Sequence, residues 1–319
     1  MLAALLTTAF FAATVVFARR AALALGSTAA NFVRLLLAAL LLGAWSWMFG
    51  HGFGVAFGWF FVSGLVGFGL GGLLMFHALP RSGANLGNLT VQCGSAVVAL
   101  AVEWVWLGTP LSAGRLTCIA AILGGVIVGL APRGLPQFAP RQLAIGAALA
   151  GLSALGQGVG QVLSRKAFIV VRAGGGKVDP GTVNFERVLA GLLVAAVALA
   201  IAWAVSKFRT TVPTEGNAGG AASAVRPIEN RQSKIENLGA AVPWVFLNTL
   251  TGPILGVTCL QWALSQPQIP AGVTQSIVAA APLLTAPLAW KLGEDLPRAR
   301  YFAGAALAVA GTAALWWVK

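Results

Sequence analysis

Polar side chains recur at helical spacing within the apolar stretch 84–107. Successive members are separated by 3, 4, 3 and 8 residues: Asn85, Asn88, Gln92, Ser95 and Glu103. At about 100° per residue, they fall within about 80° of one another around a helix. Such a stripe predicts one wall of a water-filled substrate cavity, in which Glu103 binds a proton or a cation. Two alternatives stay open: the amides hydrogen-bond to neighbouring helices, and Glu103 is solvated at the membrane edge.

A weaker stripe occurs in and just beyond the apolar stretch 143–163. Four small or polar residues share one face of the expected helix: Ser153, Gln157, Gly160 and Ser164. Gln161 lies about 80° away from that face. The pattern predicts that Gln157 and Gln161 also line the cavity. Close packing of helices through small residues is the alternative.

The apolar stretch 270–291 combines polar residues with two prolines, Pro282 and Pro287. Each proline removes one backbone hydrogen-bond donor and leaves a carbonyl without its partner. A broken helix is tolerated in a membrane where protein or a wet cavity satisfies that backbone. We therefore expect Gln275, Ser276 and the backbone before Pro282 to contribute to a binding site, and a simple kink is the alternative.

Two arginines, Arg34 and Arg187, lie near the start of two expected helices that share a sequence pattern. A guanidinium can bind an anionic group such as a carboxylate or a phosphate. It can also extend to the lipid headgroups while its aliphatic stem stays in the membrane. Both roles stay open for these two residues. Glu186 is expected to pair with the neighbouring Arg187 at the membrane interface.

The helices that carry these residues must lie in a membrane. Of 319 residues, 58% are hydrophobic and only 9% are charged, with 21 basic and 8 acidic side chains. A soluble domain carries about a quarter charged residues, so a soluble globule, a disordered chain and a disulfide scaffold are excluded. The basic residues that give the net charge of +13 stand singly or in pairs between apolar runs. This pattern is typical of loops at anionic headgroups and not of a nucleic-acid surface.

Ten apolar runs predict an all-α polytopic protein with ten transmembrane helices. A span needs roughly 20 apolar residues, and only helices or closed barrels satisfy the backbone in lipid. The continuous runs lack the alternation of barrel strands. Their approximate bounds are 2–18, 32–49, 55–77, 84–107, 115–132, 143–163, 187–206, 242–264, 270–291 and 301–318. Residues 207–240, rich in Ala, Gly, Ser and Asn, are expected to form a flexible loop.

Three short patterns recur in the same order in the two halves of the chain. Arg19-Arg20-Ala21 returns as Arg165-Lys166-Ala167, Asn31-Phe32-Val33-Arg34 as Asn184-Phe185-Glu186-Arg187, and Gly108-Thr109-Pro110-Leu111 as Gly293-Glu294-Asp295-Leu296. These matches indicate a duplication, with one repeat at 1–135 and the other at 141–319. Because five spans is an odd number, the second copy enters the membrane from the opposite side. Inverted repeats of this kind are typical of secondary transporters.

The order of these motifs resembles the EamA-like ten-helix family of the drug/metabolite transporter superfamily. Further elements of the resemblance are the exits Ala78-Leu79 and Ala263-Leu264, the segment Leu292-Gly293-Glu294, and the glycines Gly304 and Gly311. The sequence departs from the family where Thr109 stands in place of a frequent acid, and the first helix lacks the usual Trp-Gly. The resemblance implies export of a small metabolite that is amino acid-, nucleoside- or drug-like. It also implies a multi-pass protein of the cell (inner) membrane with cytoplasmic termini. The excess of Lys and Arg in the odd-numbered loops would instead place the termini outside, so the orientation stays open.

Other functions have less support in the sequence. Without a G-x-x-x-x-G-K-[ST] loop, an ion gradient or substrate exchange must drive transport. Two unpaired histidines and the lack of H-E-x-x-H or G-x-S-x-G argue against an enzyme, and no cofactor or metal is predicted. A passive channel or a non-transport membrane partner protein remains the alternative. The expected partners are the lipid bilayer and a small-molecule substrate but not nucleic acid, and a homodimer stays open.

Pairs of glycines four residues apart predict close helix packing. They are Gly67 and Gly71, Gly125 and Gly129, and Gly252 and Gly256. Small residues at this spacing let two helix backbones approach each other in a membrane. The stretch 67–72 also matches the dinucleotide pattern G-x-G-x-x-G through Gly67, Gly69 and Gly72. It lies in an apolar span without a βαβ unit, so nucleotide binding is not expected.

Overall fold

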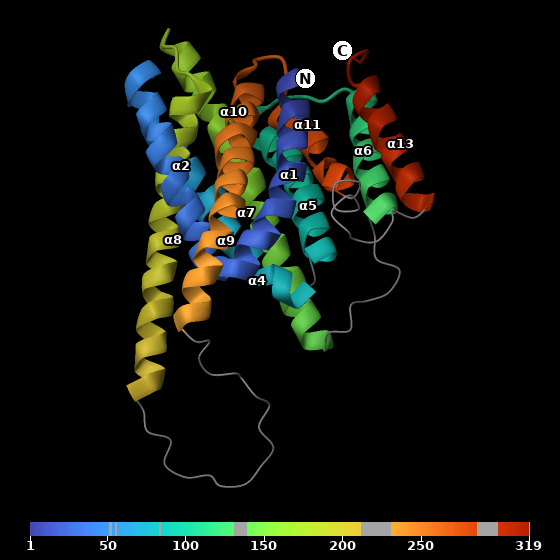
Figure 1. The fold of residues 1–319 in the computed structure, drawn as a ribbon. Coiled ribbons are helices and arrows are strands. Elements are labelled where there is room, and N and C mark those ends of the chain that lie inside the picture. The colour runs from blue at the N-terminus through green and yellow to red at the C-terminus, as the bar shows by residue number, and fades with distance from the viewer. Residues whose placement is uncertain are drawn as a thin grey trace.

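The computed structural model describes residues 1–50, 53–54, 56–82, 84–130, 139–211, 231–285 and 299–318. Over these residues the regular structure is helical, without a strand (Figure 1). Seven of the described helices are long and apolar enough to cross a membrane, and Leu2–Ala18 and Ala271–Thr285 form shorter apolar helices. The predicted all-α polytopic membrane fold is therefore confirmed.

The first half contains five helical rods, the third of which has a π-helical middle. Its elements are α1 (Leu2–Leu25), α2 (Ser27–Phe49), α3 (Phe57–Ser63), η1 (Gly64–Leu70), α4 (Gly71–Ser82), α5 (Ala84–Leu107) and α6 (Ala113–Leu130). The second half repeats this order with α7 (Pro140–Ala173), α8 (Pro180–Thr211), α9 (Arg231–Thr249), η2 (Leu250–Gly256), α10 (Val257–Ser265), α11 (Ala271–Val278) and α13 (Ala299–Ala314).

Two helices extend well beyond the apolar runs that predict them. The helix α7 has 34 residues and α8 has 32. At 1.5 Å per residue each is about 50 Å long, compared with about 30 Å for the hydrocarbon core. Helices α8 and α9 also take up both ends of the expected loop 207–240, and residues 212–230 lie outside the described part of the chain.

The two halves run in opposite directions through the bundle. In Figure 1, α1 leads away from the side on which both termini lie, whereas α7 leads towards it. Helix packing follows the same two-fold relation. The equivalent helices α2 and α8 pack against each other, and so do α6 and α13. The contact of α5 with α7 is the counterpart of the contact of α11 with α1. The inverted repeat predicted from the sequence is thus the organising feature of the fold.

The π-helical turns η1 and η2 show the duplication most directly. They begin at Gly64 and Leu250, which occupy nearly the same place in the two repeats relative to the exits at Leu79 and Leu264. Each turn lies against the first helix of the opposite half, where a glycine permits close approach. A Cβ on Gly67 would lie 3.3 Å from the Cα of Gly160, and a Cβ on Gly252 would lie 3.0 Å from the Cγ2 of Thr14. Thr14 and Gly160 are equivalent positions, each at the same distance along the chain before a repeated basic pair.

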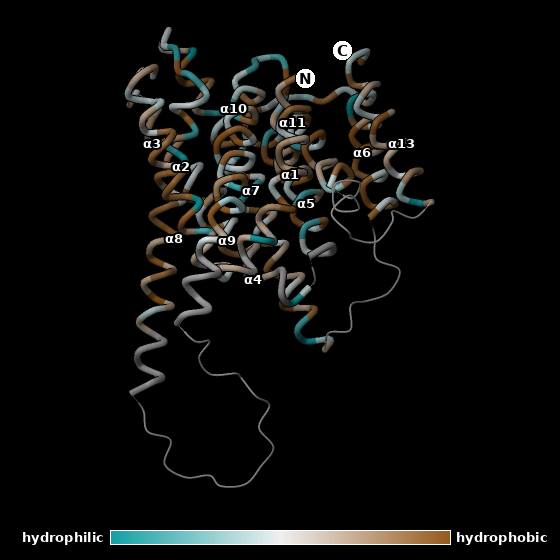
Figure 2. The backbone as a smooth tube through the Cα atoms, viewed as in Figure 1, coloured by the Kyte–Doolittle hydropathy of each residue, from teal (hydrophilic) through white to brown (hydrophobic). Residues whose placement is uncertain are grey.

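The ends of the helices mark the boundary of the apolar zone. Figure 2 shows hydrophobic residues along the middle of the helices. Helix ends on the side of the termini carry exposed tryptophans: Trp45, Trp47, Trp104, Trp106, Trp316 and Trp317. Tryptophan is enriched where hydrocarbon meets headgroups, so these residues form an aromatic belt on that side.

Candidate functional site

Buried polar residues from three helices meet between the two halves. The amide Nε2 of Gln161 on α7 donates to Oε1 of Gln275 on α11 at 2.6 Å. The Nε2 of Gln275 in turn donates to the hydroxyl of Ser95 on α5 at 2.8 Å, and all three residues are buried. We name Ser95, Gln161 and Gln275 the amide cluster. It joins polar residues that the sequence predicted separately in three apolar stretches.

The short helix α11 places Gln275 in this cluster. Its α-helical bonding stops at Val278, and Ala280 and Leu283 then donate to carbonyls only three residues earlier, at 3.1 and 2.9 Å. The backbone therefore leaves the α-helix just before Pro282, where the proline cannot donate. Ser276 is also buried, but its hydroxyl donates to the Gly272 carbonyl of its own helix at 2.8 Å. Pro287 lies outside the described residues.

A buried ion pair lies beyond the amide cluster, towards the side of the termini. The Nε of Arg165 on α7 is 3.2 Å from Oε1 of Glu103 on α5. The other carboxylate oxygen accepts the backbone N–H of Gly272 at 3.1 Å. Glu103 is only 2% exposed, so the structure places it inside protein contacts rather than at a solvated helix end.

Arg165 also holds the connection between α10 and α11. Its Nη1 donates to the carbonyls of Leu264 and Gln266 at 3.2 and 2.5 Å, and its Nη2 donates to Pro267 at 2.8 Å. From the sequence, Arg165 was predicted only as a basic residue at the end of an apolar run, and this role was not predicted. The available signal was its spacing of four residues from Gln161 and eight from Gln157, which places it on the same helix face.

The remaining residues of the α5 stripe are less buried. Asn88 and Gln92 are half-buried, and Oδ1 of Asn88 has no partner among the described residues. Asn85 belongs to α5, but its side chain lies outside the described part of the structure. On α7, Gln157 donates to the hydroxyl of Ser153 at 3.3 Å and does not join the amide cluster.

The two repeated arginines differ in their surroundings. Arg34 donates from Nε to Oδ1 of Asn31 at 2.9 Å, within its own repeated motif. Asn184 instead donates to the Pro253 carbonyl at 2.6 Å and to Thr258 at 2.9 Å. Arg187 is 3% exposed, and its Nε and Nη1 have no hydrogen-bond partner among the described residues.

The expected ion pair between Glu186 and Arg187 is not formed in the described structure. Both side chains are buried, and Oε2 of Glu186 is also without a partner. The prediction was wrong because consecutive residues of a helix point about 100° apart. Their charges therefore face different neighbours.

The start of α8 is fixed by an aspartate cap. Asp179 precedes Pro180, and its carboxylate accepts the N–H and the hydroxyl of Thr182 at 2.9 and 2.5 Å. This is the preferred chemistry for a helix N-terminus with proline at its first position. Burial alone would raise the pKa of Asp179, but the bonds from Thr182, Trp45 and Gly181 hold it below its ordinary value. The cap sets the register of α8 and thereby the positions of Asn184 and Arg187.

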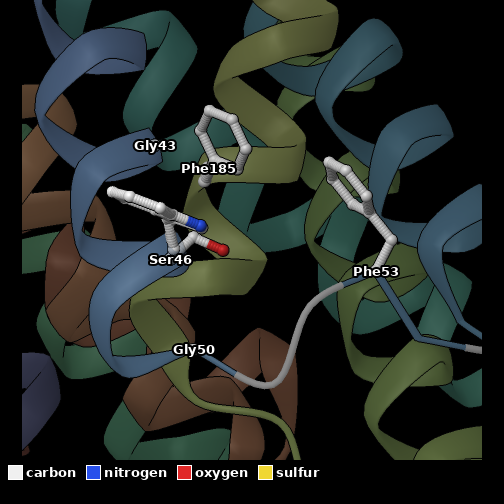
Figure 3. A pocket seen from close by; sticks show the side chains of 6 residues that line it. Gly43, Ser46, Gly50, Phe53 and Phe185 are labelled. Carbon is white, nitrogen blue, oxygen red and sulfur yellow. The ribbon is translucent and has the colours of Figure 1, made fainter.

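A separate pocket of about 250 Å³ opens near the same end of α8. Figure 3 shows Phe185 and Phe53 beside the end of α2. The lining residues are mainly apolar or glycine: Gly43, Ser46, Trp47, Gly50, Phe53 and Phe185. The sequence did not predict this pocket, and it contains none of the predicted site residues.

Comparison with known proteins agrees with this architecture. Residues 1–130 match the model of the EamA-like transporter family, a family of transporters, and this confirms the resemblance inferred from the motifs. A solved structure titled "Crystal structure of protein" is 19% identical, covers 99% of this chain and 97% of its own, and gives a TM-score of 0.66. No curated protein matches the chain. The structural likeness supports the fold alone, over nearly the full length.

Replacing Gln275 by Leu should destabilise the protein by about 1–3 kcal/mol. The change keeps the side-chain volume but leaves the Gln161 amide and the Ser95 hydroxyl buried without this partner, and unsatisfied buried groups cost that amount. Thermal unfolding of the purified protein, followed by tryptophan fluorescence, measures the effect. Gln268→Leu is the matched control because Gln268 is exposed. Equal melting temperatures for the two variants would contradict the structural role of the amide cluster.

Proposed function

We propose that this protein is a secondary transporter that exports a small metabolite by alternating access. One observation carries the proposal: buried polar residues of the two inverted halves bond to each other at their interface, Gln275 to Ser95 and Arg165 to Glu103. Inverted-repeat transporters place their substrate sites between the halves. The match of residues 1–130 to a transporter family supports the same function.

In this mechanism the halves rock about the amide cluster. The substrate enters from the cytoplasm, where we place both termini, and leaves on the opposite side of the cell membrane. Opening towards the termini separates α5 from α7 and α11, and therefore breaks the Glu103–Arg165 pair and the bond to Gly272. Asn88, Gln92, Gln157 and Gln161 then face the substrate path. An ion gradient or exchange of substrates supplies the energy.

The ion pair is specific to one side of the membrane. The sequence position equivalent to Arg165 in the first repeat is Arg19. The position equivalent to Glu103 in the second repeat, in the register that aligns Leu79 with Leu264, is Leu288. The equivalent place on the side of the membrane away from the termini thus has no acid at this position. We infer that Glu103 couples transport to protons, because a protonated carboxyl loses its ionic attraction to Arg165 and favours opening.

Counterflow in liposomes tests the proposed function. The purified protein is reconstituted, loaded with an unlabelled candidate substrate, and offered the same compound in labelled form. The panel contains amino acids, nucleosides and cationic drugs. A transporter gives saturable uptake that the internal substrate stimulates, whereas a channel gives neither saturation nor stimulation from the opposite side. Absence of saturable counterflow for every compound that binds would reject the proposal.

Glu103→Gln should make transport independent of an imposed pH gradient while counterflow of substrate continues. Glutamine keeps one acceptor oxygen, which can serve either Arg165 or Gly272, and it cannot bind or release a proton. Uptake is measured with and without a proton gradient, and size-exclusion chromatography checks folding. Glu294→Gln, which changes an acid in the other repeat, is the control. A pH response equal to that of the unaltered protein would reject Glu103 as the coupling group.

A further inference from the structure

Unpartnered buried polar atoms are concentrated in the second half of the protein. Of nine such side-chain atoms in the described residues, seven lie on α8, α9 and α10. They are Oδ1 of Asn184, Oε2 of Glu186, Nε and Nη1 of Arg187, Oδ1 of Asn248, and both amide atoms of Gln261. Leaving such an atom unsatisfied costs about 1–3 kcal/mol. The set therefore constitutes binding capacity that the folded chain itself does not use.

The equivalent positions of the first half lack this capacity. Asn31 is bonded to Arg34. Ser63, at the position equivalent to Asn248, bonds to the Gly160 carbonyl at 2.6 Å and to Ser164 at 2.7 Å. The position equivalent to Gln261 is occupied by a phenylalanine. The duplication thus kept the helix packing in both halves, whereas at these compared positions the free atoms lie in the second half; in the described first half, Oδ1 of Asn88 is the one free atom of this kind.

Arg187 carries the positive charge among these groups, which also include the carboxyl of Glu186. A Cβ added to Gly64 would overlap the backbone of Arg187. A Cβ added to Gly67 would lie 3.6 Å from the Nη2 of Arg187. Gly67 in turn lies against Gly160, so the guanidinium is near the place where α8, η1 and α7 converge. No described carboxylate pairs with it, since Glu103 is bonded to Arg165. A buried charge without a counter-ion costs several kcal/mol.

We propose that Arg187 binds the carboxylate of the transported metabolite. This inference rests on the proposed function and narrows its substrates to small carboxylic acids. With the Glu186 carboxyl protonated, one monoanion balances the one guanidinium, whereas a phosphate dianion would leave a net negative charge in the membrane interior. Three uncharged side chains on the same group of helices offer further bonds to a polar molecule: the free Oδ1 atoms of Asn184 and Asn248 can accept, and the Gln261 amide can accept and donate.

Ligand-induced thermal shifts of the purified protein test the proposal. The probes are the proteinogenic amino acids, lactate, glycerol 3-phosphate and uridine, and every carboxylate that stabilises the protein is compared with its own amide. Carboxylates should raise the melting temperature and their amides should not. Arg187→Gln should abolish this shift and raise the dissociation constant at least about 30-fold, as expected when a buried charge loses its partner. Arg172→Gln, at an exposed arginine, is the control.

The ligand-free Arg187→Gln protein separates binding from a structural role. Because the free guanidinium is buried and unpaired, its removal should leave the melting temperature unchanged or higher. A lower melting temperature, a carboxylate shift that persists in Arg187→Gln, or shifts from uncharged or phosphorylated probes alone would each overturn the inference. Saturable counterflow of a nucleoside would then still support the transporter. Conversely, an Arg187-dependent carboxylate shift without counterflow would reject transport and retain the binding site.

Discussion

Arg165→Met is expected to destabilise the folded protein by about 3–5 kcal/mol, because it leaves Glu103 as a buried charge without its partner. The variant also removes the donors that hold the carbonyls of Leu264, Gln266 and Pro267. The connection between α10 and α11 should therefore loosen together with the ion pair. Thermal unfolding in detergent measures the loss, and Lys166→Met, at the less buried neighbour, provides the control.

A double variant distinguishes the charge effect from lost packing. When both members of a buried pair are replaced by apolar residues of similar size, stability is often unchanged or higher. Glu103→Leu with Arg165→Met should therefore recover much of the melting temperature that Arg165→Met loses. If the double variant is less stable than both single variants, the main contribution of the pair is not the burial of opposite charges.

Gly304→Val should separate α13 from α6 and destabilise the protein by about 3 kcal/mol, at the upper end for overpacked sites. A Cβ on Gly304 would overlap the Gly125 carbonyl oxygen and lie 2.5 Å from the Gly129 nitrogen. These are backbone atoms, so no flexible side chain can move to accept the extra volume. The clash falls on the α6–α13 pair that relates the fifth helices of the two repeats.

Gly124→Val is the matched control for this change. A Cβ on Gly124 meets no atom within 4 Å, although the residue lies beside Gly125 on α6. Its melting temperature should stay at that of the unaltered protein, and that of Gly304→Val should fall. Similar values for both variants would contradict close backbone contact between α6 and α13.

The sequence predicted the helices and the polar faces but not which faces meet. Periodicity assigned Ser95, Gln161 and Gln275 to three polar faces, because the direction of a side chain follows from its position in a helix. Their contact depends on how helices far apart in the chain pack, and periodicity carries no such information. The glycine pairs did predict contacts between helices, since Gly67, Gly125 and Gly252 lie where two helices touch.

Charged residues were the hardest to place from sequence. Arg165 ended an apolar run and therefore looked like a headgroup anchor, yet it is buried against Glu103. A charge inside a membrane protein is stable only with specific partners, and those partners come from α5 and from the α10–α11 connection. The sequence alone shows the number of charges and their spacing along one helix, whereas the cost of burial depends on the neighbours.

The one-sided position of the Glu103–Arg165 pair has a consequence for the kinetics of the proposed transport cycle. A bond that stabilises only one closed gate changes the resting populations of the two conformations, by a factor of ten for every ~1.4 kcal/mol. Apparent affinity falls with the fraction of molecules in the binding-competent state. The ligand should therefore bind with different apparent affinity from the two sides of the membrane. The direction of net flux, in contrast, is set by the gradients alone, so the pair can adjust the speed of export but cannot by itself make the protein an exporter.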